Sequence, residues 1–260
     1  MRRFLIFLGI GLAACGGTSG ASSTADSGPS DPPSAGQSLD AVPGDLSPGE
    51  VDVRNITMSD GTEITYALIL PNGFDPAQQY PVLLAMPPGG QDVNLTVSVA
   101  ESTYAPEALA RGWVVLSPAA PDGTLFFQGS EQYIPEFLEA HAWIKPEGGR
   151  YHLAGISNGG RSAFRVAALN PDSYASMVVF PGFPESDEDR DTLRDLANIP
   201  FAMFVGGEDP GWQGPMAEAR DTLESLGADV AFEIREGEGH VMASLSDGVD
   251  IFDFLDSARG

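Results

Sequence analysis

The chain has 260 residues, of which 42% are hydrophobic, and this is enough apolar side chain for one domain with a sizeable core. Acidic residues outnumber basic ones by 37 to 13, which gives a formal net charge of −24. A surface of that sign repels nucleic-acid phosphates and anionic lipid, so nucleic acid is not expected as a partner and any membrane association needs an anchor.

The first 15 residues have the features of a secretion signal. A positive Met-Arg-Arg stretch precedes a short apolar run, residues 4–12, and the sequence Leu-Ala-Ala-Cys then ends at Cys15. This last sequence resembles the lipobox of bacterial lipoproteins, which implies that the sulfur of Cys15, the sole cysteine, is lipidated. Several acyl chains would anchor the protein firmly to a membrane. In Gram-negative lipoproteins an aspartate after the cysteine commonly retains the protein at the inner membrane, so with Gly16 at that position the resemblance implies a lipid-anchored protein of the cell envelope, at the outer membrane or facing the periplasm, or exposed at the surface. An ordinary secretory signal is the alternative.

Residues 16–50 are rich in Gly, Ser, Pro, Ala and Asp and contain almost no large apolar side chains. Such a segment buries too little surface to offset the entropy lost on ordering the chain. We therefore predict a lipoprotein signal over residues 1–15, a disordered tether over residues 16–50, and one globular domain over residues 51–260. The domain is expected to be a monomer.

From residue 51 the sequence alternates between segments typical of strands and of helices. The first two strands flank a Ser59-Asp60-Gly61 turn and alternate polar with apolar residues, which predicts an antiparallel hairpin. The later strands are continuous apolar runs separated by helices, which predicts a mostly parallel, doubly wound α/β sheet covered on both faces. Strands are predicted at residues 51–57, 62–70, 80–86, 113–117, 151–154, 174–180, 200–205 and 230–235, and helices at 95–111, 134–143, 161–169, 191–196, 215–226 and 249–256.

The pentapeptide Gly155-Ile156-Ser157-Asn158-Gly159 stands between a predicted strand and a predicted helix. Its G-x-S-x-G spacing is typical of a nucleophilic serine on a sharp strand-to-helix turn. Glycines suit this turn because side chains beside the strained central residue would collide with neighbouring elements. Sites in doubly wound sheets lie beyond the carboxyl ends of the strands, and this turn is at such an end. Ser157 is therefore the predicted nucleophile.

A serine hydroxyl needs a base to accept its proton. Of the three histidines, His152 lies inside a predicted strand and is expected to pack in the fold, whereas His141 lies inside a predicted helix and is expected to be a surface or a packing residue. His240 lies in a glycine-flanked loop after the last strand, from which it can reach over the end of the sheet. His240 is therefore the predicted base.

The base in turn needs a carboxylate that orients it. A loop over residues 206–210 follows the strand predicted at 200–205, and Asp209 in this loop is the preferred acid. Glu208 is its nearest rival, because a shift of one residue in the loop would exchange the two. Asp187 and Glu185, which follow the preceding strand, are weaker candidates.

The oxyanion hole is expected to combine two backbone N–H groups. One is that of Asn158, the residue after the serine. The other should come from the loop over residues 86–91, where Pro87 and Pro88 have no N–H to donate. Gly89 or Gly90 is therefore the second predicted donor.

The serine turn, the glycine-rich loop ending at Gln91, and the chain order Ser157, Asp209, His240 resemble the α/β-hydrolase superfamily. The Ser-Asn-Gly-Gly sequence is similar to that of esterases in the poly(3-hydroxybutyrate) depolymerase and feruloyl esterase group. This resemblance implies a serine esterase that cleaves small-molecule or polymeric carboxylic esters through an acyl-enzyme. The chain departs from the group where two prolines replace its common His-Gly, and it is too compact to carry a large lid.

Four aromatic residues lie in loops on the expected side of the site and could line an apolar substrate pocket. They are Phe126, Phe127, Phe183 and Trp212. The equally weighted alternative is that they cap the hydrophobic core.

Three other functions use the same residues or the same fold. A serine peptidase or an acyltransferase would need the same triad, and a surface-binding lipoprotein could keep the hydrolase fold without catalysis. No cofactor and no metal ion is expected, because the few histidines and the lack of clustered ligands argue against a metal site.

Overall fold

The protein is described by a computed structural model that covers residues 42–259. Its main sheet has eight strands in the order β1-β2-β5-β4-β7-β8-β9-β10, and β3 and β6 form a separate parallel pair. The strands are β1 (Val51–Thr57), β2 (Glu63–Ile69), β3 (Gln79–Tyr80), β4 (Val82–Met86), β5 (Val114–Pro118), β6 (Lys145–Pro146), β7 (Tyr151–Gly155), β8 (Tyr174–Val179), β9 (Phe201–Gly206) and β10 (Val230–Arg235).

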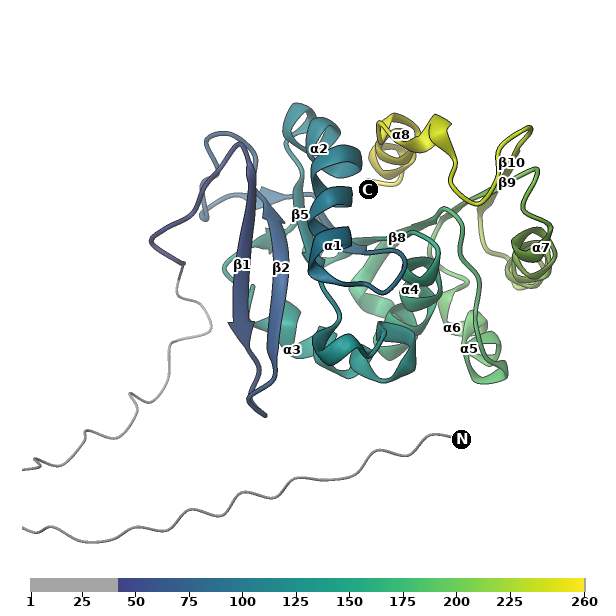
Figure 1. Ribbon diagram of the computed structural model, residues 1–260, viewed down its shortest axis with the longest axis horizontal. Coiled ribbons are helices and arrows are strands. Elements are labelled where there is room, and N and C mark those ends of the chain that lie inside the picture. The colour runs from purple at the N-terminus through teal and green to yellow at the C-terminus, as the bar shows by residue number, and fades with distance from the viewer. Residues whose placement is uncertain (1–41, 260) are drawn as a thin grey trace, which may run out of the picture. The chain divides into compact units, whose positions relative to one another are not determined.

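The pairing of the strands confirms the predicted fold class. Strands β1 and β2 form an antiparallel hairpin, in which Val51 pairs with Ile69 and Thr57 with Glu63. Strand β2 is also antiparallel to β5, whereas β5, β4, β7, β8, β9 and β10 are parallel to one another. The hairpin forms one edge of the sheet and β10 the other, as Figure 1 shows.

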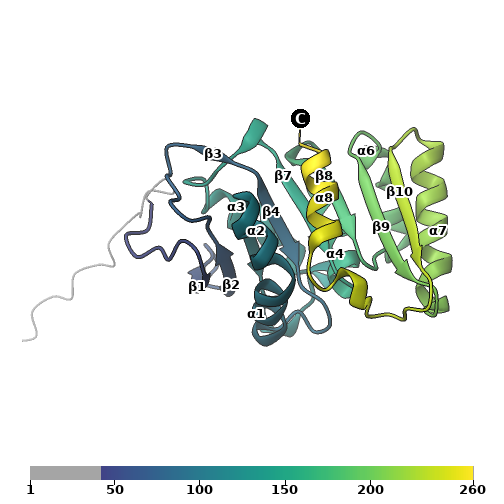
Figure 2. The ribbon, with the colours of Figure 1, turned by 90° about the horizontal axis from the view of Figure 1, so that it is seen from above.

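Helices cover both faces of this sheet (Figure 2). Buried residues of the α1–α2 region and of α8 pack on one face, and those of α3, α4, α6 and α7 pack on the other. The helices are α1 (Val93–Val99), α2 (Ala105–Arg111), α3 (Ile134–Glu139), α4 (Asn158–Leu169), α5 (Asp187–Asp191), α6 (Leu193–Leu196), α7 (Pro210–Ser225) and α8 (Val249–Ser257).

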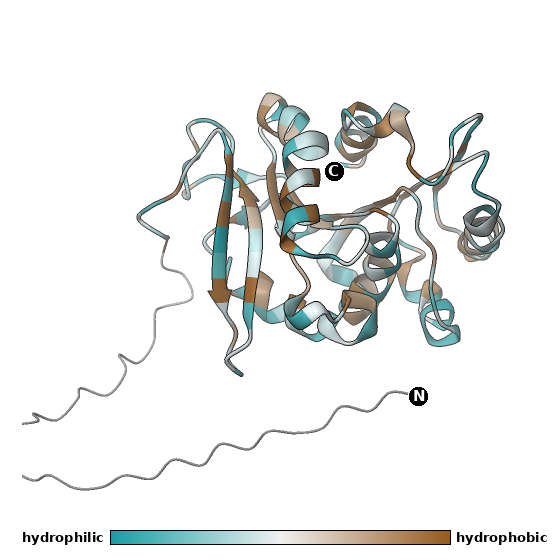
Figure 3. Ribbon diagram, in the orientation of Figure 1, coloured by the Kyte–Doolittle hydropathy of each residue, from teal (hydrophilic) through white to brown (hydrophobic). Residues whose placement is uncertain are grey.

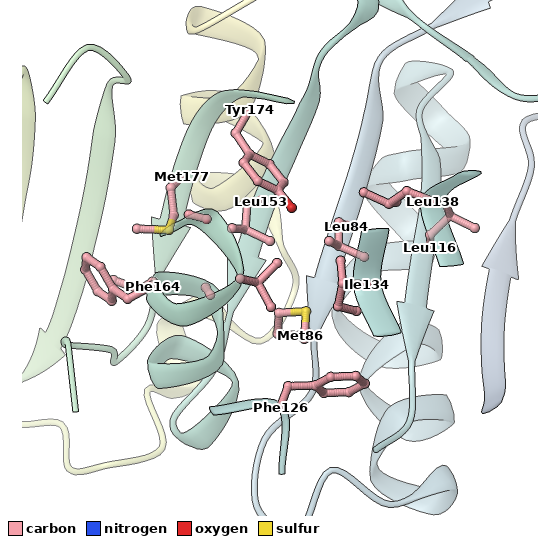
Figure 4. Packing of buried hydrophobic residues seen from close by; sticks show 14 of the residues in the cluster. Leu84, Met86, Leu116, Phe126, Ile134, Leu138, Leu153, Phe164, Tyr174 and Met177 are labelled. Atoms are coloured by element: carbon pink, nitrogen blue, oxygen red, sulfur yellow. The ribbon is translucent and has the colours of Figure 1, made fainter. Parts of the chain in front are cut away.

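The core on the α4 side holds the turn after β7 in place. Leu153 of β7 and Phe164 of α4 are fully buried, and Figure 4 shows them between the sheet and the helix together with Met177 of β8. Hydrophobic residues follow the central strands and the inner helix faces, while many connecting segments are hydrophilic (Figure 3). Burial of this kind contributes about 25 cal/mol per Å² of apolar surface to the free energy of unfolding. It therefore stabilises the packing of β7 against α4.

Several helices differ from their predicted limits. The helix predicted at 95–111 begins earlier, because the Asp92 side chain accepts a hydrogen bond from the N–H of Leu95 and caps it. It also changes to a π-helix over Ala100–Tyr104 before α2 continues, and Gly112 ends α2 with a positive φ of 77°. Residues 180–200 hold only the short helices α5 and α6.

The globular domain begins before residue 51. Leu46 packs against the core, Asp45 pairs with Arg54 at 2.7 Å, and the N–H of Gly49 donates to the carbonyl of Leu70 at 2.9 Å. Within the segment assigned to the tether, residues 42–50 thus contact the domain through an apolar side chain, an ion pair and a backbone hydrogen bond. The predicted signal, Cys15 and the remaining tether lie outside the described residues.

Candidate active site

Ser157 lies on the turn between β7 and α4, at the carboxyl end of the strand. Its backbone has φ 57° and ψ −117°, a sparsely populated conformation for a residue with a side chain. The turn is closed by the N–H of Ser157, which donates to the carbonyl of Pro181 at 2.8 Å. A Cβ atom at Gly159 would collide with the carbonyl oxygen of Met86, so the helix can approach β4 this closely only with glycine there.

The structure brings the three predicted triad residues together from three different segments. The Oγ of Ser157 lies 2.8 Å from Nε2 of His240, and Nδ1 of His240 lies 2.7 Å from Oδ2 of Asp209. A carboxylate can only accept, so Nδ1–H donates to Asp209 and leaves Nε2 of a neutral imidazole free to accept the serine proton. The Asp209 side chain is 13% exposed and that of His240 is 39% exposed.

The loop that carries His240 is tied to neighbouring segments. Glu238 accepts hydrogen bonds from the hydroxyl and the N–H of Ser244, and these bonds hold the pKa of Glu238 below its usual range. The carbonyl of Glu238 also accepts from the N–H of Glu208 at 2.8 Å. The histidine loop and the Asp209 loop are therefore bonded to each other through their backbones.

The other acidic candidates lie elsewhere. Glu208 is exposed and its backbone, not its carboxylate, bonds to the histidine loop. Glu185 pairs with Arg161 at 2.8 Å, and Asp187 pairs with Arg190 at 2.8 Å. Of the four candidates, Asp209 is the one that contacts His240.

The two remaining histidines are buried in the core. Nδ1 of His141 donates to the carbonyl of Phe137 at 2.7 Å, and Nδ1 of His152 lies 2.7 Å from the hydroxyl of Ser176. Burial lowers the pKa of each to about 4. The position of His152 agrees with the packing role expected from the sequence, and for His141 the packing alternative holds rather than the surface one.

The predicted oxyanion donors come from two segments, the start of α4 and the loop after β4. Asn158 is the first residue of α4, and its side-chain amide donates to the carbonyl of Gly89 at 2.8 Å. This bond joins the serine turn directly to the loop after β4. Gly89 has φ +59° and lines the cavity beside Ser157, whereas Gly90 does not line it. Of the two glycines predicted as the second donor, Gly89 is therefore the one beside the cavity.

From the sequence, Gln91 was named only as the end of the glycine-rich loop, and its side chain was assigned no role in the site. Its side chain is fully buried, and its amide NH2 donates to the carbonyl of Pro87 and to the hydroxyl of Ser162 at 3.1 and 2.9 Å. Its Oε1 accepts from the N–H of Phe126 at 2.8 Å. A polar residue directly after Pro-Pro-Gly-Gly was the only signal in the sequence. Gln91 fastens the loop to α4 and to the segment after β5.

A cavity of about 580 Å³ opens beside Ser157, but it is not the predicted aromatic pocket. Its lining comes from the loop after β4, from α1 and the π-helix, from the serine turn, from the residue after β8 and from the histidine loop. The residues are Pro88, Gly89, Leu95, Val99, Ser102, Thr103, Ile156, Ser157, Phe180, His240, Val241, Met242, Leu245 and Ser246. None of the four predicted aromatic residues belongs to this lining.

The predicted aromatic residues have other positions. Phe126 is fully buried in the core, so for this residue the core-capping alternative holds. Phe127, Phe183 and Trp212 gather around the guanidinium of Arg161, whose Cζ lies 5.8, 4.8 and 4.5 Å from the three ring centroids. An aromatic side chain in a loop can line a substrate cavity or pack on a neighbouring cation, and the sequence pattern does not show which of these two contacts it makes.

Two further features of the described residues concern metal-binding groups and membrane-spanning helices. Within residues 42–259, no group of three or more His, Cys, Asp or Glu side chains is arranged to hold a metal ion. Among the helices of the same range, none combines the length and apolar character needed to cross a bilayer.

Comparison with known proteins identifies the fold. No family model matches the chain. A solved thermostable esterase is 15% identical with a TM-score of 0.62, and the match covers 81% of this chain but only 60% of the esterase. An S-formylglutathione hydrolase from Agrobacterium tumefaciens is 18% identical with a TM-score of 0.64, covering 80% of this chain and 95% of that one. A ferulic acid esterase is 15% identical with a TM-score of 0.58, and the match covers 81% of this chain and 98% of that one. The chain has the α/β-hydrolase fold.

Proposed function

We propose that the protein is a serine hydrolase that cleaves carboxylic esters through an acyl-enzyme. The observation that carries this proposal is the continuous hydrogen-bonded series from Ser157 Oγ through His240 to Asp209, with distances of 2.8 and 2.7 Å. A serine on a strained turn, a base within hydrogen-bond reach and a carboxylate behind the base are the parts that acyl transfer requires. The esterases among the structural neighbours favour esters as the substrates.

The first half of the reaction forms the acyl-enzyme. Oγ of Ser157 bonds to the ester carbonyl carbon while Nε2 of His240 takes the hydroxyl proton. The carbonyl oxygen becomes an oxyanion, which accepts hydrogen bonds from the backbone N–H groups of Asn158 and Gly89. His240 then gives its proton to the alkoxy oxygen, the carbon–oxygen bond breaks, and the alcohol leaves.

The second half regenerates the serine. His240 takes a proton from water as the water oxygen bonds to the acyl carbon, and it returns that proton to Oγ as the acid leaves. Asp209 stabilises the imidazolium that forms in each half. Each oxyanion donor contributes about 3 kcal/mol to lowering such a barrier, and the N-terminus of α4 adds favourable dipole charge.

Turnover of p-nitrophenyl esters by the purified full-length protein tests the proposal. The Ser157→Ala variant should lose at least about a thousandfold in kcat, since the nucleophile is gone. Ser225→Ala, an exposed serine at the end of α7, is the matched control and should keep wild-type turnover. Wild-type turnover by Ser157→Ala would exclude the mechanism.

Two further measurements separate the alternatives. Labelling by a fluorophosphonate that depends on Ser157 separates a hydrolase from a surface-binding protein that keeps the fold without catalysis. An anilide with the same acyl group, and an alcohol added as acyl acceptor, separate an esterase from a peptidase and an acyltransferase.

We also propose a cell-envelope location for the protein, with a lipid on Cys15 as its anchor. The proposal rests on the order of the charged, apolar and Leu-Ala-Ala-Cys segments at the N-terminus. Mass spectrometry of the protein from a membrane fraction tests it. A mature chain that is soluble and carries no lipid would contradict it.

A further inference from the structure

The cavity beside Ser157 has walls that are mostly aliphatic. Leu95 and Val99 of α1 form part of the lining, and Val241, Met242 and Leu245 of the histidine loop form another part. A volume of about 580 Å³ lies within the roughly 300–1,000 Å³ typical of small-molecule sites. Both Ser157 and His240 belong to this lining, so a ligand held here touches the reacting groups.

Charge is absent from the walls although the whole chain carries −24. Among residues 42–259, the lining contains no Asp, Glu, Lys or Arg, and its polar side chains besides Ser157 and His240 are the hydroxyls of Ser102, Thr103 and Ser246. A ligand carboxylate would find no cation here to offset the cost of losing its water. It would also meet the negative potential of the acidic protein.

Two of the lining side chains are apolar and exposed. Val241 is 85% exposed and Leu95 is 37% exposed, and both belong to the small set of large hydrophobic residues that the fold leaves open to water. They lie at the same cavity although they are far apart in the sequence. An apolar ligand would cover them, and covering apolar surface is favourable in proportion to its area.

The local backbone supports this wall. The helix widens to a π-helix at Ala100–Tyr104, and two residues of that turn, Ser102 and Thr103, line the cavity. π-Helical turns are rare and occur often at functional sites. On the other side, Leu95 approaches Gly89 closely enough that a Cβ there would lie 2.8 Å from its Cδ1. The aliphatic wall therefore continues directly into the loop of the expected oxyanion donor.

We propose that this cavity binds a neutral aliphatic chain of the ester substrate, longer than two carbons, and that it selects against chains that end in a charge. The inference rests on the proposed esterase function and specifies the substrate class of the same site. The chain can belong to the acyl group or to the alcohol, because the lining includes both Gly89 and His240.

Two substrate series test the proposal on the purified full-length protein. One varies the acyl chain of p-nitrophenyl esters from acetate to octanoate, and the other varies the alcohol of acetate esters from ethanol to octanol. Each CH2 group that enters the cavity should raise kcat/KM about twofold to fourfold. A rise in either series supports the proposal and shows which side of the ester bond the cavity holds. A flat response in both series overturns it.

A charged chain of equal length provides the second comparison. The p-nitrophenyl half-ester of suberic acid, which ends in a carboxylate, should react at least tenfold more slowly in kcat/KM than the octanoate ester. Leu95→Lys places a cation in the wall of the cavity and should reduce the ratio of kcat/KM for the octanoate ester to kcat/KM for the suberate half-ester. Leu226→Lys, at an exposed leucine after α7, is the control and should leave that ratio unchanged. Equal rates with neutral and charged chains in the wild type would overturn the proposal.

The Ser157→Ala variant distinguishes a failure of the cavity assignment from a failure of the esterase proposal. Ester turnover that depends on Ser157 but ignores chain length and charge overturns the cavity assignment and leaves the esterase proposal standing. If no ester is turned over in a Ser157-dependent way, both proposals fail.

Discussion

The indole of Trp212 packs against the imidazole of His240, with ring centroids 4.8 Å apart and planes inclined by 53°. The same indole contacts the ring of Phe183 at 4.9 Å and lies 4.5 Å from the Arg161 guanidinium carbon. Trp212 thus connects the expected base to a cluster of aromatic rings around a cation. Since it is not among the cavity lining, its effect on the reaction should be exerted through His240.

We expect Trp212→Leu to act as the loss of a positioning residue. The imidazole would gain rotational freedom, and small errors in the placement of reacting groups are costly, so kcat should fall about tenfold to a hundredfold. KM for short esters should change less than threefold, because the indole does not line the cavity. Steady-state kinetics with p-nitrophenyl butyrate measure both constants.

Trp212→Phe is the conservative control for this change. A benzene ring can still pack on the imidazole, so most of kcat should return. A large increase in KM with kcat unchanged would instead place Trp212 in substrate binding, which is one of the two alternatives that the sequence left open for it.

Asp209 and Glu208 offer a direct comparison of neighbouring carboxylates. In Asp209→Asn, the amide can donate to Nδ1 and favour the tautomer that carries its proton on Nε2, so kcat should fall by up to about 10⁴. Glu208→Gln removes an exposed carboxylate that does not reach His240 and should change kcat less than threefold. Similar losses in the two variants, measured on the same ester, would contradict the assignment of the acid.

Gln91→Leu should weaken both the fold and the reaction. The change leaves the N–H of Phe126 and the hydroxyl of Ser162 without their buried partner, at a cost of about 1–3 kcal/mol in the free energy of unfolding. It also releases the loop that carries Gly89, so kcat should fall by at least about tenfold.

Chemical denaturation and ester turnover measure the two effects of Gln91→Leu. Gln128→Leu, which replaces an exposed glutamine, is the control and should change neither quantity greatly. A stable Gln91→Leu protein with wild-type kcat would show that the loop holds its shape without this side chain.

The serine turn could be predicted because its constraints are local. Gly155 and Gly159 are required by backbone atoms that lie within a few residues or on the adjacent strand, and the spacing records that requirement. The loops of Asp209 and His240 follow from the same logic, since parallel strands bring their carboxyl ends to one edge. The fold class was therefore accessible from the sequence pattern, whereas the order of the strands in the sheet was not predicted.

The substrate cavity depends on long-range geometry that the pattern does not record. Val241 and Leu95 are separated by most of the domain, and only the packed fold shows that they share one cavity. Phe126 was a candidate for the substrate pocket because it is an aromatic residue in a loop, yet its side chain is completely buried in the core. Gln91 was overlooked because its three hydrogen-bond partners come from distant or unremarkable positions in the sequence.

Acid pH should destabilise the domain through its two buried histidines. Burial lowers the pKa of His141 to about 4, and burial together with the charges of Arg259 and Arg150 lowers the pKa of His152 to about 4. In the unfolded chain both groups titrate near 6.5. Between these values the unfolded state binds more protons than the folded state, so the free energy of unfolding decreases as the pH falls from about 6.5 to about 4.

Each histidine should contribute up to about 3 kcal/mol to this decrease, from a pKa difference of about 2.5. Urea denaturation at several pH values between 7.5 and 4 measures it. His141→Met removes one titrating group, and although the variant loses the bond to Phe137, its stability should vary with pH only about half as steeply as that of the wild type. A variant with the full wild-type slope would show that His141 is not the group that binds the proton on unfolding.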